Sequence, residues 1–198
     1  MNRRVLVAAA LVSTLWACKS NGREDDRSSE PEYQDMSRQS AGTSTHASTP
    51  KLSSEERRFT EEALRSGQFE IEISRLALQK ASSGKVRDFA TMMVADHGQA
   101  NRDLESLARK NGIYAPTTLD PDNQAKLDEL RRLDGPAFDK EFQEVQVALH
   151  DRAIRMFDEA SRECRDEELR NFVIRTLPTL QQHRSYLDDV AVATSKSD

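Results

Sequence analysis

The feature that most constrains the fold is a spacing of four and three residues, repeated along four segments between residues 52 and 190. In each segment, mostly apolar residues recur alternately four and three positions apart, which places them on one face of an α-helix. The chain is also rich in Glu, Arg, Lys, Leu and Ala and has few β-branched runs, which favours helices over strands. The spacing therefore predicts four long amphipathic helices that bury their apolar faces against one another.

Capping and turn residues divide these segments. Ser53 followed by Glu56 is a capping-box pair, which predicts the start of the first helix. Residues 82–84, Ser-Ser-Gly, predict a turn into the second helix, and Gly112 predicts its end. Asp166 is the predicted N-cap of the fourth helix, where negative charge suits the helix dipole.

The lengths of the connections predict the topology. Short turns join the first helix to the second and the third to the fourth, so each pair is an antiparallel hairpin. About two dozen residues join the hairpins, enough to travel the length of the helices. This connection contains a short helix that starts at Asp120-Pro121, and Gly135-Pro136 starts the next helix. One long crossover between helices 2 and 3 predicts an all-α, ferritin-like four-helix bundle.

Residues 1–18 are typical of a bacterial lipoprotein signal, with Arg3 and Arg4 followed by an uncharged, mostly apolar stretch that ends at Cys18. Cys18 is the predicted lipidation site, which predicts an exported protein of the periplasm or outer membrane with the membrane as a partner through the lipid. Trp16 is bulky where such signals have a small residue. The alternative is ordinary secretion with cleavage near Ala17.

The remaining boundaries follow from composition. Residues 19–50 are polar without hydrophobic periodicity, which predicts a disordered linker. The bundle is expected over residues 51–192 and a flexible tail over residues 193–198. The only other cysteine is Cys164, so no internal disulfide is expected if Cys18 is acylated or removed.

Charge and motifs exclude several classes of function. The net charge is -5, and charged residues of both signs are spread along the predicted helices. No nucleic-acid partner is therefore expected, because binding phosphates needs clustered Lys and Arg. The chain has no phosphate-binding glycine loop, no cysteine pair for zinc and no Ser-His-Asp signal. The sequence therefore assigns no enzymatic activity to the chain, and it identifies no protein partner.

Four polar residues interrupt the apolar faces, one in each predicted helix: Glu70, His97, His150 and His183. Counted from the turns, Glu70 and His97 lie level, whereas His150 and His183 are offset by about 4–6 Å. Pro178 precedes His183 by five residues and can kink its helix. The second pair is thus compatible with convergence on the same level.

Three imidazoles and one carboxylate suit a transition metal such as zinc, iron, manganese or copper. Asp96 and Gln146 are the candidate residues that would orient these ligands from a second shell. A ferritin-type di-iron site needs two Glu-x-x-His motifs, but Val94 and Leu180 occupy the positions three before His97 and His183. The alternative is a buried polar layer that fixes helix register without metal, in a structural or interaction protein.

Ordered motifs resemble a known family. They are Gly67-x-x-Glu70, Phe89-Ala90-x-Met92-Met93-x-x-Asp96-His97, Gln146-Val147-x-x-His150 and Leu177-Pro178-x-Leu180-x-x-His183. Over about Leu52 to Val190, the chain resembles the bacterial domain of unknown function 4142. The resemblance implies a ferritin-like helical domain in an exported protein, without an assigned biochemical role.

Replacing the predicted lipidation site tests the anchor. If Cys18 carries the lipid, Cys18→Ser moves the protein from the membrane fraction to a soluble fraction, as measured by immunoblotting of fractionated cells. A wild-type protein that is already soluble in the periplasm or medium would instead show simple secretion.

Overall fold

The computed structural model describes residues 52–194, which contain five α-helices and no strand. These residues belong to one of two units of the chain, His46–Asp198. The predicted signal with Cys18, the predicted linker and residues 195–198 of the predicted tail lie outside the described residues. The all-helical prediction is confirmed for the described range.

Four of the helices are long and one is short. Their bounds are α1 Ser54–Lys80, α2 Gly84–Lys110, α3 Pro121–Arg131, α4 Gly135–Glu163 and α5 Glu167–Thr194. Helix α5 runs two residues beyond the predicted end of the domain at residue 192. None of the helices in the described range is long and apolar enough to cross a membrane.

The predicted capping residues make the expected bonds. Ser53 Oγ accepts a hydrogen bond from the Glu56 amide at 3.1 Å, and Glu56 Oε2 accepts one from the Ser53 amide at 2.8 Å. Asp166 Oδ1 accepts a bond from the amide of Leu169 at 2.8 Å, which caps α5. Gly112 follows α2 with a φ of 68°, a conformation that glycine adopts without steric cost.

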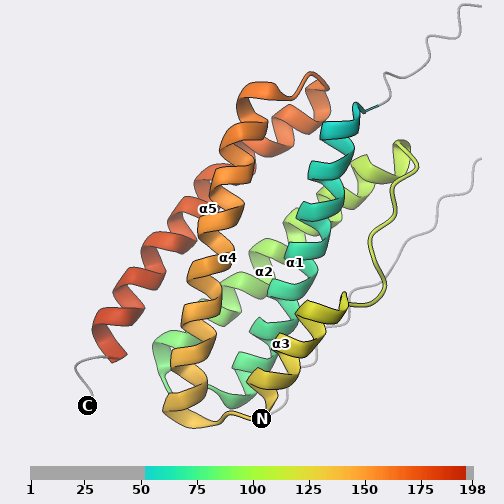
Figure 1. The fold of residues 1–198 in the computed structure, drawn as a ribbon. Helices are drawn as coiled ribbons and strands as arrows, with labels where there is room; N and C mark the ends of the chain where they lie inside the picture. Colours follow the sequence, from blue (N-terminus) through green and yellow to red (C-terminus); the bar gives the residue numbers. More distant parts are fainter. Residues whose placement is uncertain (1–51, 195–198) are drawn as a thin grey trace, which may run out of the picture. The chain divides into compact units, whose positions relative to one another are not determined.

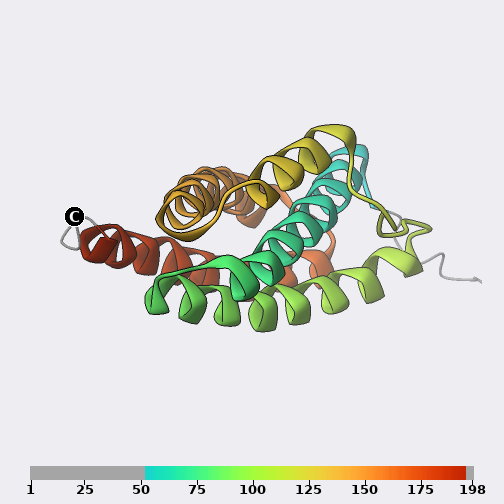
Figure 2. The same ribbon diagram turned by 90° about the horizontal axis from the view of Figure 1, so that it is seen from below.

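The long helices pack side by side in a closed arrangement. Helix α1 packs against α2 and α4, and α5 packs against the same two helices. Residues 81–83 and 164–166 form the short connections within the pairs α1–α2 and α4–α5, whose helices run in opposite directions (Figure 1). Helix α3 lies in the long connection and packs on α1 and α4, on the side away from α2 and α5 (Figure 2).

The buried apolar residues form two clusters, one toward each end of the long helices. The first includes Phe59, Leu104, Phe157 and Leu180, and the second includes Phe89, Phe138, Phe142 and Leu187. In every long helix, the predicted polar residue falls close to the boundary between these clusters. The fold therefore holds a polar layer between two apolar halves of one core.

Glu56 also joins two segments that are far apart in the sequence but lie at the same end of the long helices (Figure 1). Its Oε1 atom accepts hydrogen bonds from the amides of Arg165 at 2.7 Å and Asp166 at 2.8 Å. One buried carboxylate thus caps α1 and holds the α4–α5 turn. Burial raises the pKa of Glu56, but bonds from the backbone of Asp166, Ser53 and Arg165 together lower it below the ordinary value.

Substitutions on the buried and the exposed faces of the helices should differ in how much they lower the free energy of unfolding. Phe142 is 1% exposed, so Phe142→Ala should destabilise the fold by about 3–5 kcal/mol through lost burial and a residual cavity. The Glu72 side chain is 37% exposed, so Glu72→Ala should change stability by less than about 0.5 kcal/mol. Urea unfolding measures both, and equal effects would contradict the assigned core.

The hydrogen bonds of Glu56 predict a pH-dependent contribution to the stability of the fold. At neutral pH, Glu56→Gln should destabilise the fold by about 1–3 kcal/mol, because the charged acceptor of backbone N–H groups is lost. Since the folded-state pKa is lowered, this contribution is present above the ordinary pKa of glutamate and disappears as pH falls through the folded value. Urea unfolding at a series of pH values checks this, with exposed Glu61→Gln as the matched control. A difference that stays constant into acid would contradict the assignment.

Candidate metal centre

The inward faces bring the four predicted residues into one buried layer. Exposure is 1% for Glu70, 7% for His97, 0% for His150 and 1% for His183. One nitrogen from each histidine lies within 4.8 Å of the other two. The offset counted along the chain does not separate His150 from His183, because their rings reach one another with 3.4 Å between nitrogens.

The orientation of His150 is fixed by the backbone one turn before it. Its Nδ1 atom lies 2.9 Å from the carbonyl oxygen of Gln146. A carbonyl oxygen only accepts hydrogen bonds, so Nδ1 carries the proton in this contact. Neutral His150 therefore has its lone pair on Nε2, which faces His183.

The orientation of His183 is fixed from another helix. Its Nε2 atom lies 3.0 Å from Oδ2 of Asp96, on α2. An ionised carboxylate accepts only, so Nε2 carries a proton here as well. In neutral His183 the lone pair is consequently on Nδ1, which is the atom 3.4 Å from His150 Nε2.

Two lone pairs that face each other at this distance need a positive group to stabilise them. The positive group can be a metal ion between the two nitrogens, or an additional proton on His183 that Nδ1 donates to His150. In the second case, the charge of Asp96 balances an imidazolium. The geometry is therefore compatible with both interpretations of the sequence, metal centre and polar layer.

In the part of the chain that the structure describes, Glu70 and His97 each have one atom without a hydrogen-bond partner. These are Glu70 Oε2 and His97 Nε2, which lie 3.8 Å apart. Glu70 Oε2 is also 3.6 Å from His150 Nδ1, whereas Glu70 Oε1 accepts a hydrogen bond from Ser66 at 3.0 Å. Burying a polar atom without a hydrogen-bond partner costs free energy, so these two atoms destabilise the layer as it stands.

Burial favours the neutral forms of Glu70, His97 and His150. Burial, and then the charge of His183, lower the pKa of His97 to about 3 against the opposing charge of Asp96. Burial likewise lowers the pKa of His150 against the opposing charge of Glu70, and it raises the pKa of Glu70 itself. Neutral imidazoles are the form that binds metal ions.

The two residues predicted to orient the ligands act in ways that the sequence did not specify. Asp96 contacts His183 rather than its chain neighbour His97. Gln146 contacts His150 through its backbone carbonyl, and its side chain donates to Ser74 Oγ at 3.2 Å. Glu70 adjoins the histidines, but in the described part of the chain the group of converging ligand atoms consists of the three histidines without it.

Sequence reasoning missed Ser66 and Ser74. Ser66 holds one oxygen of Glu70, and Ser74 Oγ donates to the Glu70 carbonyl while it accepts from Gln146. Both serines lie four residues from Glu70 on the same helix. That spacing places them one turn away, and it is the signal that could have identified them.

The fold and the site together define a class of protein, an all-helical domain with a buried cluster of three histidines. The family model for the domain of unknown function (DUF4142) matches residues 41–190, so the chain belongs to this family. The resemblance seen in the sequence motifs is thereby confirmed. Comparison with curated proteins gave no match.

Solved structures of related shape include two DUF305 proteins. A DUF305 fragment from Deinococcus radiodurans has a TM-score of 0.63 and 15% identity, covering 71% of this chain and 97% of that chain. A DUF305 protein from Streptomyces coelicolor has a TM-score of 0.62 and 11% identity, covering 71% and 94%. CopM in its Cu(I)-bound form has a TM-score of 0.58 and 17% identity, covering 68% and 93%. At these identities the similarity shows the fold alone.

Proposed function

We propose that this chain is an exported cell-envelope protein whose helical domain binds a transition-metal ion through His97, His150 and His183. The observation that carries the proposal is the pair of hydrogen bonds to Gln146 and Asp96. They direct free nitrogens of His150 and His183 toward each other. Such outer contacts fix the tautomers of histidine ligands in metal sites.

The spacing of the nitrogens suits a tetrahedral ion. Metal–nitrogen bonds of about 2.0–2.1 Å place neighbouring tetrahedral ligands about 3.3–3.4 Å apart. His150 Nε2 and His183 Nδ1 are 3.4 Å apart, and the whole group lies within 4.8 Å. A small inward movement of the imidazole rings is therefore enough for all three nitrogens to reach one ion. The adjacent carboxylate of Glu70 would offset part of its charge.

Copper is the first ion to test. Imidazole ligands suit copper, zinc and iron, so the donor set alone selects none of them. CopM, which shares the fold at 16–17% identity, has been solved in Cu(I)-bound and Cu(II)-bound forms. That similarity transfers no ligand residue to this chain, but it is the reason to test copper before zinc, iron and manganese in a binding experiment.

The proposal includes the finer features of the fold and its location. We infer a ferritin-like four-helix bundle in which α3 belongs to the single long crossover, with Cys18 as the lipidated residue. The contacts of α1 and α5 with α2 and α4 support the bundle. The signal-like sequence of residues 1–18 supports export and membrane anchoring.

The second candidate is a structural or interaction protein with a metal-free polar layer. The observation that favours it is the contact of Asp96 with His183, which would stabilise a protonated His183 that donates to His150. Loss of His150 destabilises the fold under either function, since its partners are left unpaired. Stability alone therefore does not separate the candidates.

Metal content separates them. Untagged protein purified without chelator should contain near-stoichiometric metal by elemental analysis, and His97→Ala and His150→Ala should lose it. The matched control is His46→Ala, which replaces the one histidine of the chain outside the proposed site and should retain the metal. Adding the bound ion at 100 times its Kd to metal-free protein should stabilise the fold by about 2.7 kcal/mol.

The opposite result supports the polar layer. Substoichiometric metal in the wild type, with no change in Tm on adding zinc, iron, manganese or copper, would exclude the metal centre.

A further inference from the structure

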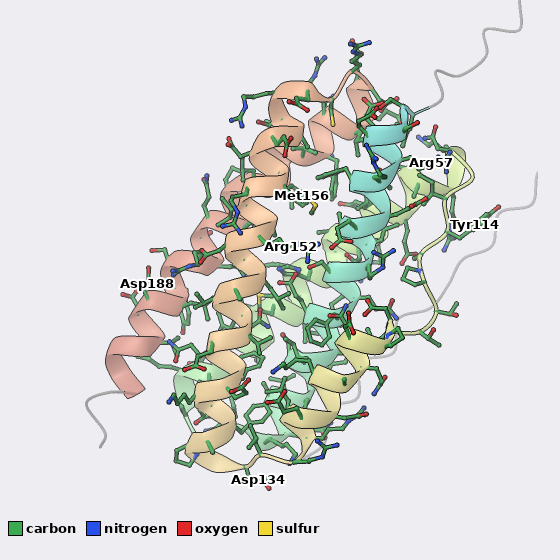
Figure 3. All side chains as sticks on the ribbon, in the orientation of Figure 1. Arg57, Tyr114, Asp134, Arg152, Met156 and Asp188 are labelled. Carbon is green, nitrogen blue, oxygen red and sulfur yellow. The ribbon has the colours of Figure 1, made fainter. Side chains whose placement is uncertain are left out.

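A small cavity adjoins the histidine cluster, inside the half of the core that contains the first apolar cluster. At one end it is lined by Glu70, Asp96, His97 and His183. The rest of its wall is mostly apolar and includes Ala63, Ala100, Leu104, Phe157 and Leu180. Met156 of α4 also lines it and lies between α4 and α1 in Figure 3.

The size of the cavity limits what it can contain. Its volume is about 40 Å³, and an enclosed water requires about 10–15 Å³ of such space. The cavity therefore has room for a molecule of about three non-hydrogen atoms. Aromatic rings and branched organic molecules are too large unless the helices separate.

Two buried residues with unpartnered polar atoms line this space. Glu70 and His97 are both more than nine-tenths buried, and Glu70 Oε2 and His97 Nε2 have no hydrogen-bond partner among the described residues. Both residues line the cavity together with His183, whose ring is held by Asp96. A molecule in the cavity would thus lie beside His97 and His183, two of the three histidines that we assign to the metal.

The charges of the wall restrict the class of molecule further. Among the residues that the structure describes, no Lys or Arg lines the cavity, whereas the carboxyl groups of Glu70 and Asp96 do. A multiply charged anion such as phosphate would thus lack a cationic side chain to balance its charge. A neutral or singly negative molecule needs only the metal ion to hold it.

We propose that this cavity is an open coordination position, in which the metal binds a neutral or singly negative ligand of two or three non-hydrogen atoms. The inference rests on the proposed metal centre. It assigns three positions of a tetrahedral ion to the histidines and the fourth to an exogenous ligand. Metal sites with three protein ligands and an open fourth position are those that act on small molecules.

Azide and cobalt(II) test the open position. Azide has three atoms in a line and one negative charge, and the visible spectrum of protein-bound cobalt(II) changes when a ligand is added. We expect azide to change the spectrum of the cobalt-loaded full-length protein in a saturable way. The cobalt Kd, measured first by titration, reports the metal centre independently of azide.

Cavity-filling variants locate the azide. Ala100→Leu, on α2, should raise the azide Kd by at least about tenfold, because added methyl groups occupy the space, while the cobalt Kd stays within about twofold. Ala95→Leu is the matched control, the same change on an exposed position of the same helix, and should leave both values unchanged. Ala63→Leu fills the cavity from α1 and repeats the test if Ala100→Leu fails to fold.

Each contrary outcome has a distinct meaning. Absence of cobalt binding would overturn the metal centre, and the open position with it. Cobalt binding without any azide response would overturn the open position alone. An azide Kd that is equal in the wild type and the filled variants would show that azide reaches the metal from outside the cavity, which also overturns the inference.

Discussion

The structure depends on one constraint, which is that four ionisable side chains are buried together in the middle of a helical core. Glu70, His97, His150 and His183 divide the apolar residues into two clusters. Burying such groups costs free energy unless they find partners among themselves. Each must therefore lie at the same level on its own helix, so the layer fixes the register of all four long helices at once.

The layer satisfies this constraint unevenly. His150 and His183 have hydrogen-bonding partners for the nitrogens that point away from each other, and Ser66 holds one oxygen of Glu70. The second Glu70 oxygen and His97 Nε2 have no hydrogen-bonding partner within residues 52–194. A layer that served only to specify the fold would gain by satisfying these atoms, since incompletely paired buried networks are costly. The uneven pattern instead resembles a site that is completed by something from outside the chain.

Much of this arrangement could be predicted from the sequence, because helical spacing reports which side chains share a face. The four polar residues, the capping box at Ser53 and the cap at Asp166 follow from local spacing. The contact of Asp96 with His183 could not be predicted, because it joins residues 87 positions apart and depends on how two helices are rotated against each other. The cavity could not be predicted for the same reason, because it results from the packing of side chains from four helices rather than from the sequence pattern of any one helix.

The double role of Glu56 has a mechanical consequence if the domain is attached through its amino-terminal end, as the proposed lipid anchor implies. Tension that reaches the fold through Leu52 and Ser53 meets the Glu56 carboxylate, which also holds the amides of Arg165 and Asp166. The load is thereby shared between α1 and the α4–α5 hairpin, so these bonds must break before α1 can be peeled away from its first turn. The histidine layer lies several turns farther along α1, so it would not be the first part of the fold to bear such tension.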